Sequence, residues 1–261
     1  MDFFVAPESI VRRIWGKGDT ILFIFAGAAA EFALNKAVDW LYFTGKLPAD
    51  PLGRLFSTVL YARQIVFSEK PVAEATIARI RSIHGGVEQA RGYAIPDWAY
   101  RDVLFMLIHY SMASYELLER RLSQAEKEDL YEVFHRMGLQ LGLKDLPRSF
   151  SDWEEARTAH LASDLEKSQY TVDLFRQYHK HLGWFRYRLL LGSQRLVVPG
   201  RVKVLMQWGW WQWVRPIVAL YKLARLVGMD RLMKSLVLPR TYRQQVFALD
   251  QDSGPEINGK K

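Results

Sequence analysis

Apolar side chains at helical spacing in residues 77–87 are the feature that most limits how this chain folds. One buried face of an α-helix recurs every three or four residues, and that spacing is kept here by Ile77, Ile80, His84 and Val87. Ser68 can cap such a helix, and Pro71 suits its first turn. The pattern therefore predicts a helix whose buried face carries an imidazole.

His84 has two interpretations on this face. A lone histidine among apolar residues is ordinarily a core residue with a satisfied hydrogen bond. However, Gly85 and Gly86 follow it directly, although each glycine inside a helix costs about 1 kcal/mol relative to alanine. Their missing side chains would let a flat ligand approach, and Arg81, one turn earlier, could reach an acidic group on it. Because a histidine with apolar walls is a common way to hold haem iron, His84 is a haem-ligand candidate.

A second helix is predicted just upstream of this one. The turn at residues 45–48 leads into it, and it should reach Phe67. Arg54 and Thr58 are four residues apart and share one face of this helix. Either they face the same ligand as His84, or Arg54 is a surface residue and the Thr58 hydroxyl bonds back to its own helix.

Helix signals dominate the remaining chain, so the predicted fold class is all-α. Residues 21–30 are apolar on every side but fall short of the roughly 20 residues needed to span a bilayer, which predicts a buried core helix. A long helix is expected over residues 98–121. Ser123 and Glu126 have the spacing of a capping box, and Ser151 is a candidate cap for the next helix.

Two other histidine sites carry weaker signals. His109 lies near the apolar seam of the predicted helix at 98–121, where it either fills a core role or faces a ligand pocket. His179 and His181 are two residues apart, so they do not face each other on a helix, and we expect both to be exposed to solvent.

No linker divides the 261 residues. We expect an N-terminal segment over residues 1–14, one all-α domain over 15–245 and a disordered polar tail over 246–261. The chain has no cysteine, which excludes disulfides, cysteine-bound zinc, iron–sulfur clusters and a thiolate-ligated haem. Residues 1–8 lack the features of a signal peptide, so a cytoplasmic location is expected.

The positive charge of the chain gathers in its last third. The formal net charge is +8, and between residues 186 and 243 many Lys and Arg residues are offset by Asp230 alone. Tryptophans are interleaved with them at residues 208–213. Amphipathic rings beside cations suit either a pocket wall or the headgroup region of a membrane. The apolar helices predicted around these tryptophans disfavour nucleic-acid binding, so we expect peripheral membrane contact or a pocket.

The residues around His84 and several segments elsewhere in the chain resemble a haem-b oxygenase family. This family includes the latex clearing proteins, which are rubber oxygenases, and the fungal endoplasmic-reticulum oxygenase of mycophenolic acid biosynthesis. The resemblance runs from about Trp15 to about Arg240. It is carried by Arg54, Thr58, Arg81 and His84, the frame Asp50-Pro51-Leu52-Gly53-Arg54, and the segments Tyr93-Ala94-Ile95-Pro96-Asp97, Asp145-Leu146-Pro147-Arg148 and Leu236-Val237-Leu238-Pro239-Arg240.

The resemblance implies a single globin-like helical domain that encloses a haem b pocket. By this resemblance His84 is the proximal iron ligand and Arg81 lies beside it, while Arg54 and Thr58 lie near the haem and contribute to catalysis. The implied activity is that of an oxidoreductase, an oxygenase that uses dioxygen or peroxide on a hydrophobic, isoprenoid-like substrate. The alternative is a cofactor-free helical peripheral membrane protein that binds lipid or a protein partner.

The chain departs from the family pattern on both sides of the implied haem. Ser57 stands where the latex clearing proteins have a lysine that can cap the iron, and Glu88 stands where they have a second arginine. Many relatives also have Trp-Val-His in place of residues 102–104. Since a hydroxyl is a far weaker iron ligand than an amine, we expect the iron face opposite His84 to be open. Haem binding therefore carries over better than rubber cleavage.

Overall fold

The computed structural model describes residues 2–43, 45, 49–209, 214–229, 234, 244, 247 and 250. These residues form α-helices and no β-strand, which confirms the predicted all-α class. The helices are α1 (Ile10–Trp15), α2 (Gly18–Phe32), α3 (Asp39–Phe43), α5 (Pro51–Phe67), α6 (Lys70–Arg91), α7 (Asp97–Leu118), α8 (Gln124–Leu141), α9 (Phe150–Ser163), α10 (Gln169–Val197), α11 (Gly200–Leu205) and α12 (Arg215–Leu226).

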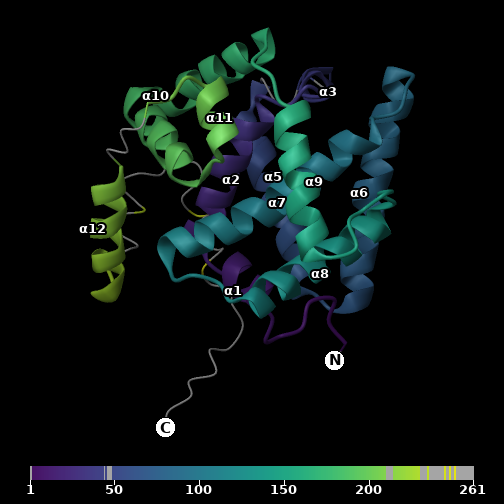
Figure 1. Cartoon of the computed structure of the whole chain (residues 1–261), viewed down its shortest axis with the longest axis horizontal. Coiled ribbons are helices and arrows are strands. Elements are labelled where there is room, and N and C mark those ends of the chain that lie inside the picture. The colour runs from purple at the N-terminus through teal and green to yellow at the C-terminus, as the bar shows by residue number, and fades with distance from the viewer. Residues whose placement is uncertain are drawn as a thin grey trace.

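Helix α2 lies at the centre of the fold and packs along α7 (Figure 1). Its apolar run is the predicted core helix, with Ile21 and Ile24 almost fully buried. Gly27 permits the close approach of the two helices, because a Cβ atom there would lie 2.3 Å from ring carbons of Tyr110. In the part of the chain that the structure describes, no helix has the length and apolar character needed to cross a membrane.

A buried ion pair joins α2 to α9 beside α7. The guanidinium of Arg157 donates to both carboxylate oxygens of Glu31 at 2.6 Å, and both side chains are almost completely buried. The hydroxyl of Tyr110 donates to the same carboxylate at 2.8 Å. Because fully buried charges are stable only when they are paired and hydrogen-bonded, this contact fixes how three helices meet.

Asp102 is the second carboxylate at this arginine. Its Oδ1 lies 3.5 Å from Arg157, farther than the Glu31 oxygens, and its other oxygen accepts a hydrogen bond from the Asn35 amide. Burial raises the pKa of Asp102 to about 7, and the Glu31 carboxylate adds to the rise. The geometry thus pairs Glu31 with the guanidinium and leaves Asp102 as the carboxyl group that can hold a proton.

The N-terminal residues pack into the same core. Phe4 and Val5 are buried, and α1 follows them with its apolar residues turned inward. Ser9 caps α1 and donates to an Asp129 oxygen at 2.7 Å, which ties this segment to α8. The described part of the predicted N-terminal segment, residues 2–14, therefore contributes to the hydrophobic core of the domain.

The two ends of the long axis carry different elements (Figure 1). Helix α6 lies at one end, whereas α10, α11 and α12 lie toward the other. Helix α10 is bent at Gly183, whose φ of 72° is left-handed. The predicted polar tail falls largely outside the described residues.

The serine caps were predicted with mixed success. Ser123 forms the predicted capping box, which is confirmed. The prediction that Ser68 is an N-cap is wrong, because Ser68 is the C-cap of α5 and Glu69 is the N-cap of α6. Ser151 is also wrong, since Ser149 has the extended backbone of a cap and its side chain accepts the first-turn hydrogen bond. Two serines separated by one residue both satisfy the sequence pattern, and only the backbone conformation chooses between them.

Breaking the buried ion pair should destabilise the protein strongly. Arg157→Ala would leave Glu31 buried without its partner, for which the expected loss in unfolding free energy is about 3–5 kcal/mol. Urea unfolding followed by circular dichroism measures it. The matched control is Arg120→Ala, which removes an exposed bidentate ion pair with Glu126. This substitution should leave the urea concentration at the unfolding midpoint nearly unchanged. Equal effects of the two substitutions would contradict the structural role of Arg157.

Candidate functional site

Helices α5 and α6 pack together and carry all four site residues predicted from the sequence. Helix α5 begins after Asp50, whose carboxylate accepts the Gly53 backbone N–H at 2.9 Å, and it ends at Phe67 as predicted. The Thr58 hydroxyl donates to the backbone carbonyl of Arg54 at 3.1 Å. Thr58 thus shares a face with Arg54, but its hydroxyl proton is engaged within its own helix.

His84 lies half-buried on α6 against the start of α7. Its ring centroid is 5.1 Å from that of Tyr100, at an interplanar angle of 37°. Burial lowers the pKa of His84, and the positive charge of Arg54 lowers it further. Among the described residues, no hydrogen bond reaches its imidazole. The ring is therefore neutral at pH 7 and has a nitrogen lone pair available to a ligand.

Glu88 and Tyr100 form the wall behind His84. One oxygen of Glu88 accepts the Tyr100 hydroxyl at 3.0 Å and the Ile95 backbone N–H at 2.8 Å. This carboxylate lies one turn after His84 and raises its pKa, in opposition to Arg54. Sequence reasoning noted Glu88 only as a departure from the family pattern and missed Tyr100. Glu88 could have been identified as a neighbour of His84, because the two residues are four apart on one helix and share a face.

The two predicted arginines lie in different surroundings. Arg54 is half-buried, and no carboxylate pairs with it in the described part of the chain. Arg81 is exposed, and its guanidinium carbon lies 3.4 Å from where a Cβ atom of Gly142 would stand, at the end of α8. The charges that shift the His84 pKa are Arg54 and Glu88. The structure thus groups His84 with Arg54 and directs Arg81 toward α8.

The helix surface next to His84 is open. Among the described residues, apart from the chain neighbours of each glycine and the backbone of α6 itself, no atom lies within 4 Å of the position that a Cβ atom would take at Gly85 or at Gly86. A neutral imidazole, bare backbone beside it and an unpaired guanidinium across from it fit a flat ligand that has acidic groups. They match what haem b requires of a protein: one nitrogen ligand, access for the ring, and a cation for a propionate.

His109 occupies a core position instead. It lies on α7, where one ring nitrogen is hydrogen-bonded to the Val197 backbone and Nε2 has no partner within the described residues. Burial lowers the pKa of His109 to about 4, and the nearby Arg157 contributes to the shift. His179 and His181 are exposed, as predicted.

Two cavities lie elsewhere on the molecule. One of about 520 Å³ is lined by residues of α10 and the segment after α11, and one of about 680 Å³ lies between the end of α7 and α12. Neither is lined by His84. Over the described ranges, no three His, Asp or Glu side chains gather where they could share a metal ion.

The fold and the comparisons together define the class of this protein as an oxygenase catalytic domain. Residues 12–232 match the family described as "ER-bound oxygenase mpaB/B'/Rubber oxygenase, catalytic domain". The chain belongs to that family, which confirms the resemblance seen in the sequence. No curated protein and no solved structure gave a significant match to the chain.

The His84 pKa gives a direct test of this geometry. Arg54→Ala should raise the pKa of His84 in the cofactor-free protein, because it removes a positive charge that disfavours the imidazolium. Arg81→Ala is the matched control and should leave that pKa unchanged. NMR titration of the histidine C2 protons measures both. A larger shift of the His84 pKa in Arg81→Ala than in Arg54→Ala would show that Arg81, and not Arg54, is the arginine near His84.

Proposed function

We propose that this domain is a haem-b-dependent oxygenase in which His84 is the proximal iron ligand. The observation that carries the proposal is the state of His84: half-buried, neutral and without a hydrogen bond from any described residue, beside the open backbone of Gly85 and Gly86. Membership in an oxygenase family supports the reaction class. Bound haem would supply the activation of dioxygen or peroxide, which side chains alone do not provide.

The residues around His84 would position the cofactor. Tyr100, held by Glu88, limits rotation of the imidazole and keeps its wall dry. Arg54 would neutralise a haem propionate or stabilise negative charge that develops in the reaction, because its guanidinium keeps its charge and offers several donors. Arg81, at the solvent side, would serve an acidic group at the haem edge. Thr58 would line the same face of α5 as Arg54.

Ser57 bears on how far the rubber-oxygenase chemistry extends to this chain. Its hydroxyl donates to the Arg54 backbone carbonyl at 2.8 Å, so its proton is engaged within α5. It therefore gives no substitute for the lysine that the latex clearing proteins have at this position. We propose a hydrophobic, isoprenoid-like substrate and a distal side that is open to small molecules, without assigning rubber as the substrate.

His84→Ala should abolish or severely weaken haem retention while the helix content stays largely unchanged, because one axial nitrogen is lost from an otherwise intact helix. The Soret absorbance of the purified protein and its far-ultraviolet circular dichroism measure the two quantities. His135→Ala is the control, since that imidazole also sits partly buried, against Tyr131, but lies on α8. A wild-type Soret band in folded His84→Ala would refute the ligation.

Features of α12 support a second proposal that is compatible with the first: this protein contacts a membrane surface through α12. Helix α12 docks on the body through both apolar and polar contacts. Val214 and Val218 are buried against Leu118 of α7. Arg225 pairs with Glu119 at 2.6 Å and with Asp19 at 3.2 Å, and Tyr221 donates to Asp19 at 3.0 Å. Lys222 adds a contact of 3.4 Å to a backbone carbonyl of α7. The face that docks on the protein thus combines buried valines with paired charges.

Another face of α12 exposes apolar side chains, of which Leu223 and Leu226 also line the cavity beside the end of α7. Leu220, Leu223 and Leu226 are 59, 62 and 83% exposed, and the helix stands at the edge of the molecule (Figure 1). Exposed leucines at three-residue spacing on a chain with net charge +8 suit the surface of an anionic membrane. Trp208 lies partly buried in a pocket wall, and residues 210–213 of the predicted tryptophan cluster lie outside the described residues.

Vesicle sedimentation tests the membrane proposal. The protein should bind vesicles that contain phosphatidylserine more tightly than neutral ones, and salt should weaken this binding, since each Lys or Arg near such a surface contributes roughly 1 kcal/mol. Leu223→Asp should reduce it severalfold. Leu139→Asp is the control, because Leu139 is also an exposed leucine but lies on α8. Binding to neither vesicle, or dimerisation that depends on Leu223, would contradict a membrane role.

A further inference from the structure

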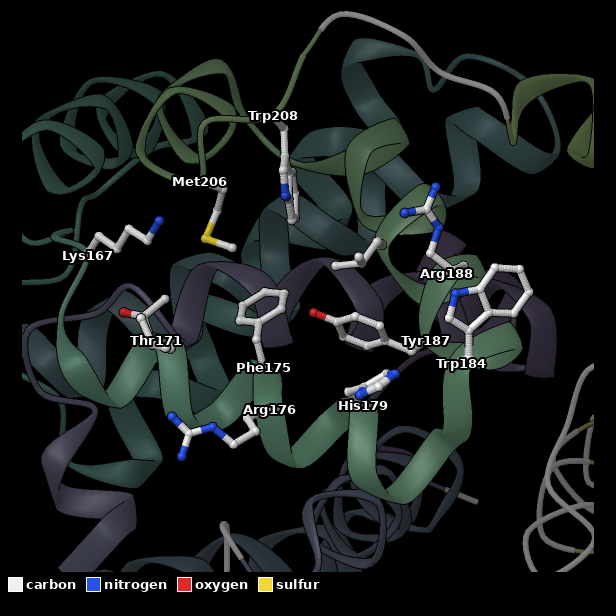
Figure 2. A pocket seen from close by; sticks show the side chains of 12 residues that line it. Lys167, Thr171, Phe175, Arg176, His179, Trp184, Tyr187, Arg188, Met206 and Trp208 are labelled. Carbon is white, nitrogen blue, oxygen red and sulfur yellow. The ribbon is translucent and has the colours of Figure 1, made fainter.

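The cavity lined by α10 and the segment after α11 is separate from the proposed oxygenase site. It has a volume of about 520 Å³, within the usual range for small-molecule sites. Its residues belong to the elements at one end of the molecule, whereas α6 with His84 lies at the other end (Figures 1 and 2). Any ligand of this cavity would thus be additional to the haem and substrate of the proposed function.

The bend at Gly183 creates the cavity. Because the chain turns back there with a φ of 72°, the first half of α10 faces the second half across the cavity (Figure 2). The walls are mainly aromatic and apolar. Phe175 lies 6.3 Å from Trp208 between ring centroids, and the ring of Tyr187 lies 4.9 Å from that of His179 and points across the cavity. An apolar chain or ring system would find continuous contact along these side chains.

The charge of the lining is entirely positive. Lys167, Arg176 and Arg188 are among its 12 residues, and none of the 12 is Asp or Glu. Arg176 is compensated by Asp173 at 3.4 Å, outside the lining. In the described part of the chain, no ion pair compensates Lys167 or Arg188. Figure 2 shows the Lys167 ammonium directed into the cavity and the Arg188 guanidinium directed toward the side of Trp208.

A second uncompensated guanidinium lies behind Trp208. Arg195 stacks over the Trp208 ring at 5.6 Å, and its buried Nε has no hydrogen-bond partner among the described residues. Burial lowers the pKa of Arg195, and the charge of Arg188 lowers it further. This end of the cavity is therefore positively charged, and a guanidinium without a carboxylate partner is a group that an anionic head would stabilise.

We propose that this cavity binds an amphiphile that has one apolar chain and an anionic head, either carboxylate or phosphate. The chain would lie along Phe175, Tyr187 and Trp208, and the head would meet Arg188. The aromatic walls alone would accept any apolar molecule. The unpaired guanidinium of Arg188 selects the molecules that carry a negative charge.

Calorimetric titration with oleate, oleyl alcohol and oleyl phosphate, which share one chain, tests this site. Oleate should bind the purified protein more tightly than the alcohol, which has the same chain without the charge. Arg188→Gln should weaken oleate binding about tenfold or more, the usual effect of losing one charge-assisted hydrogen bond, and leave the alcohol unchanged. Tyr187→Ala should weaken both. Arg176→Gln is the matched control and should bind oleate as the wild type does, because Arg176 already pairs with Asp173.

Each outcome decides the proposal. Tighter binding of oleyl phosphate assigns a phosphate head, and tighter binding of oleate, which has the same chain length, assigns a carboxylate head. Equal affinity for oleate and oleyl alcohol, an unchanged oleate affinity in Arg188→Gln, or no binding of either anion would overturn it. His84→Ala should keep the oleate affinity of the wild type, whatever its haem content. Loss of oleate binding in folded His84→Ala would show that the chain binds at the oxygenase site instead.

Discussion

The bidentate pair between Arg157 and Glu31 is the contact on which the rest of this fold depends. It holds α9 to α2, and the Tyr110 hydroxyl brings α7 to the same carboxylate. With Tyr110 fixed against Gly27, the direction of α7 is set. The first turn of α7 carries Tyr100, which forms one wall of His84. The core network therefore reaches the candidate site through a single helix.

The network also shows how a core can contain charge. Two carboxylates surround one guanidinium, and Asp102, whose pKa burial raises to about 7, can relieve the excess by holding a proton. The Asn35 amide donates to the second oxygen of Asp102, and the Tyr110 hydroxyl donates to a Glu31 oxygen that also accepts from Arg157. Such a network contributes to how precisely the helices are placed more than to net stability, because an apolar core of the same shape would avoid the cost of desolvating charges.

The sequence predicts local features of this protein well and its non-local contacts poorly. Helical spacing predicted the all-α class, the end of α5 at Phe67 and the inward face of His84. By contrast, Arg157 and Glu31 are 126 residues apart, and nothing in the spacing of either residue identifies the other. The contact between Tyr100 and His84 and the fold-back of α10 at Gly183 depend on tertiary packing in the same way. The roles of Arg54 and Thr58 came only from the family resemblance.

The central claim is that His84 makes this domain a haem protein. The most direct measurement is the haem content of wild-type protein produced with a haem precursor, determined as the pyridine haemochrome and divided by the protein concentration. The proposal predicts about one haem per chain, because it assigns one axial histidine beside one open helix surface. A folded protein that contains no haem, and that gives no Soret shift when titrated with haemin, would contradict the claim.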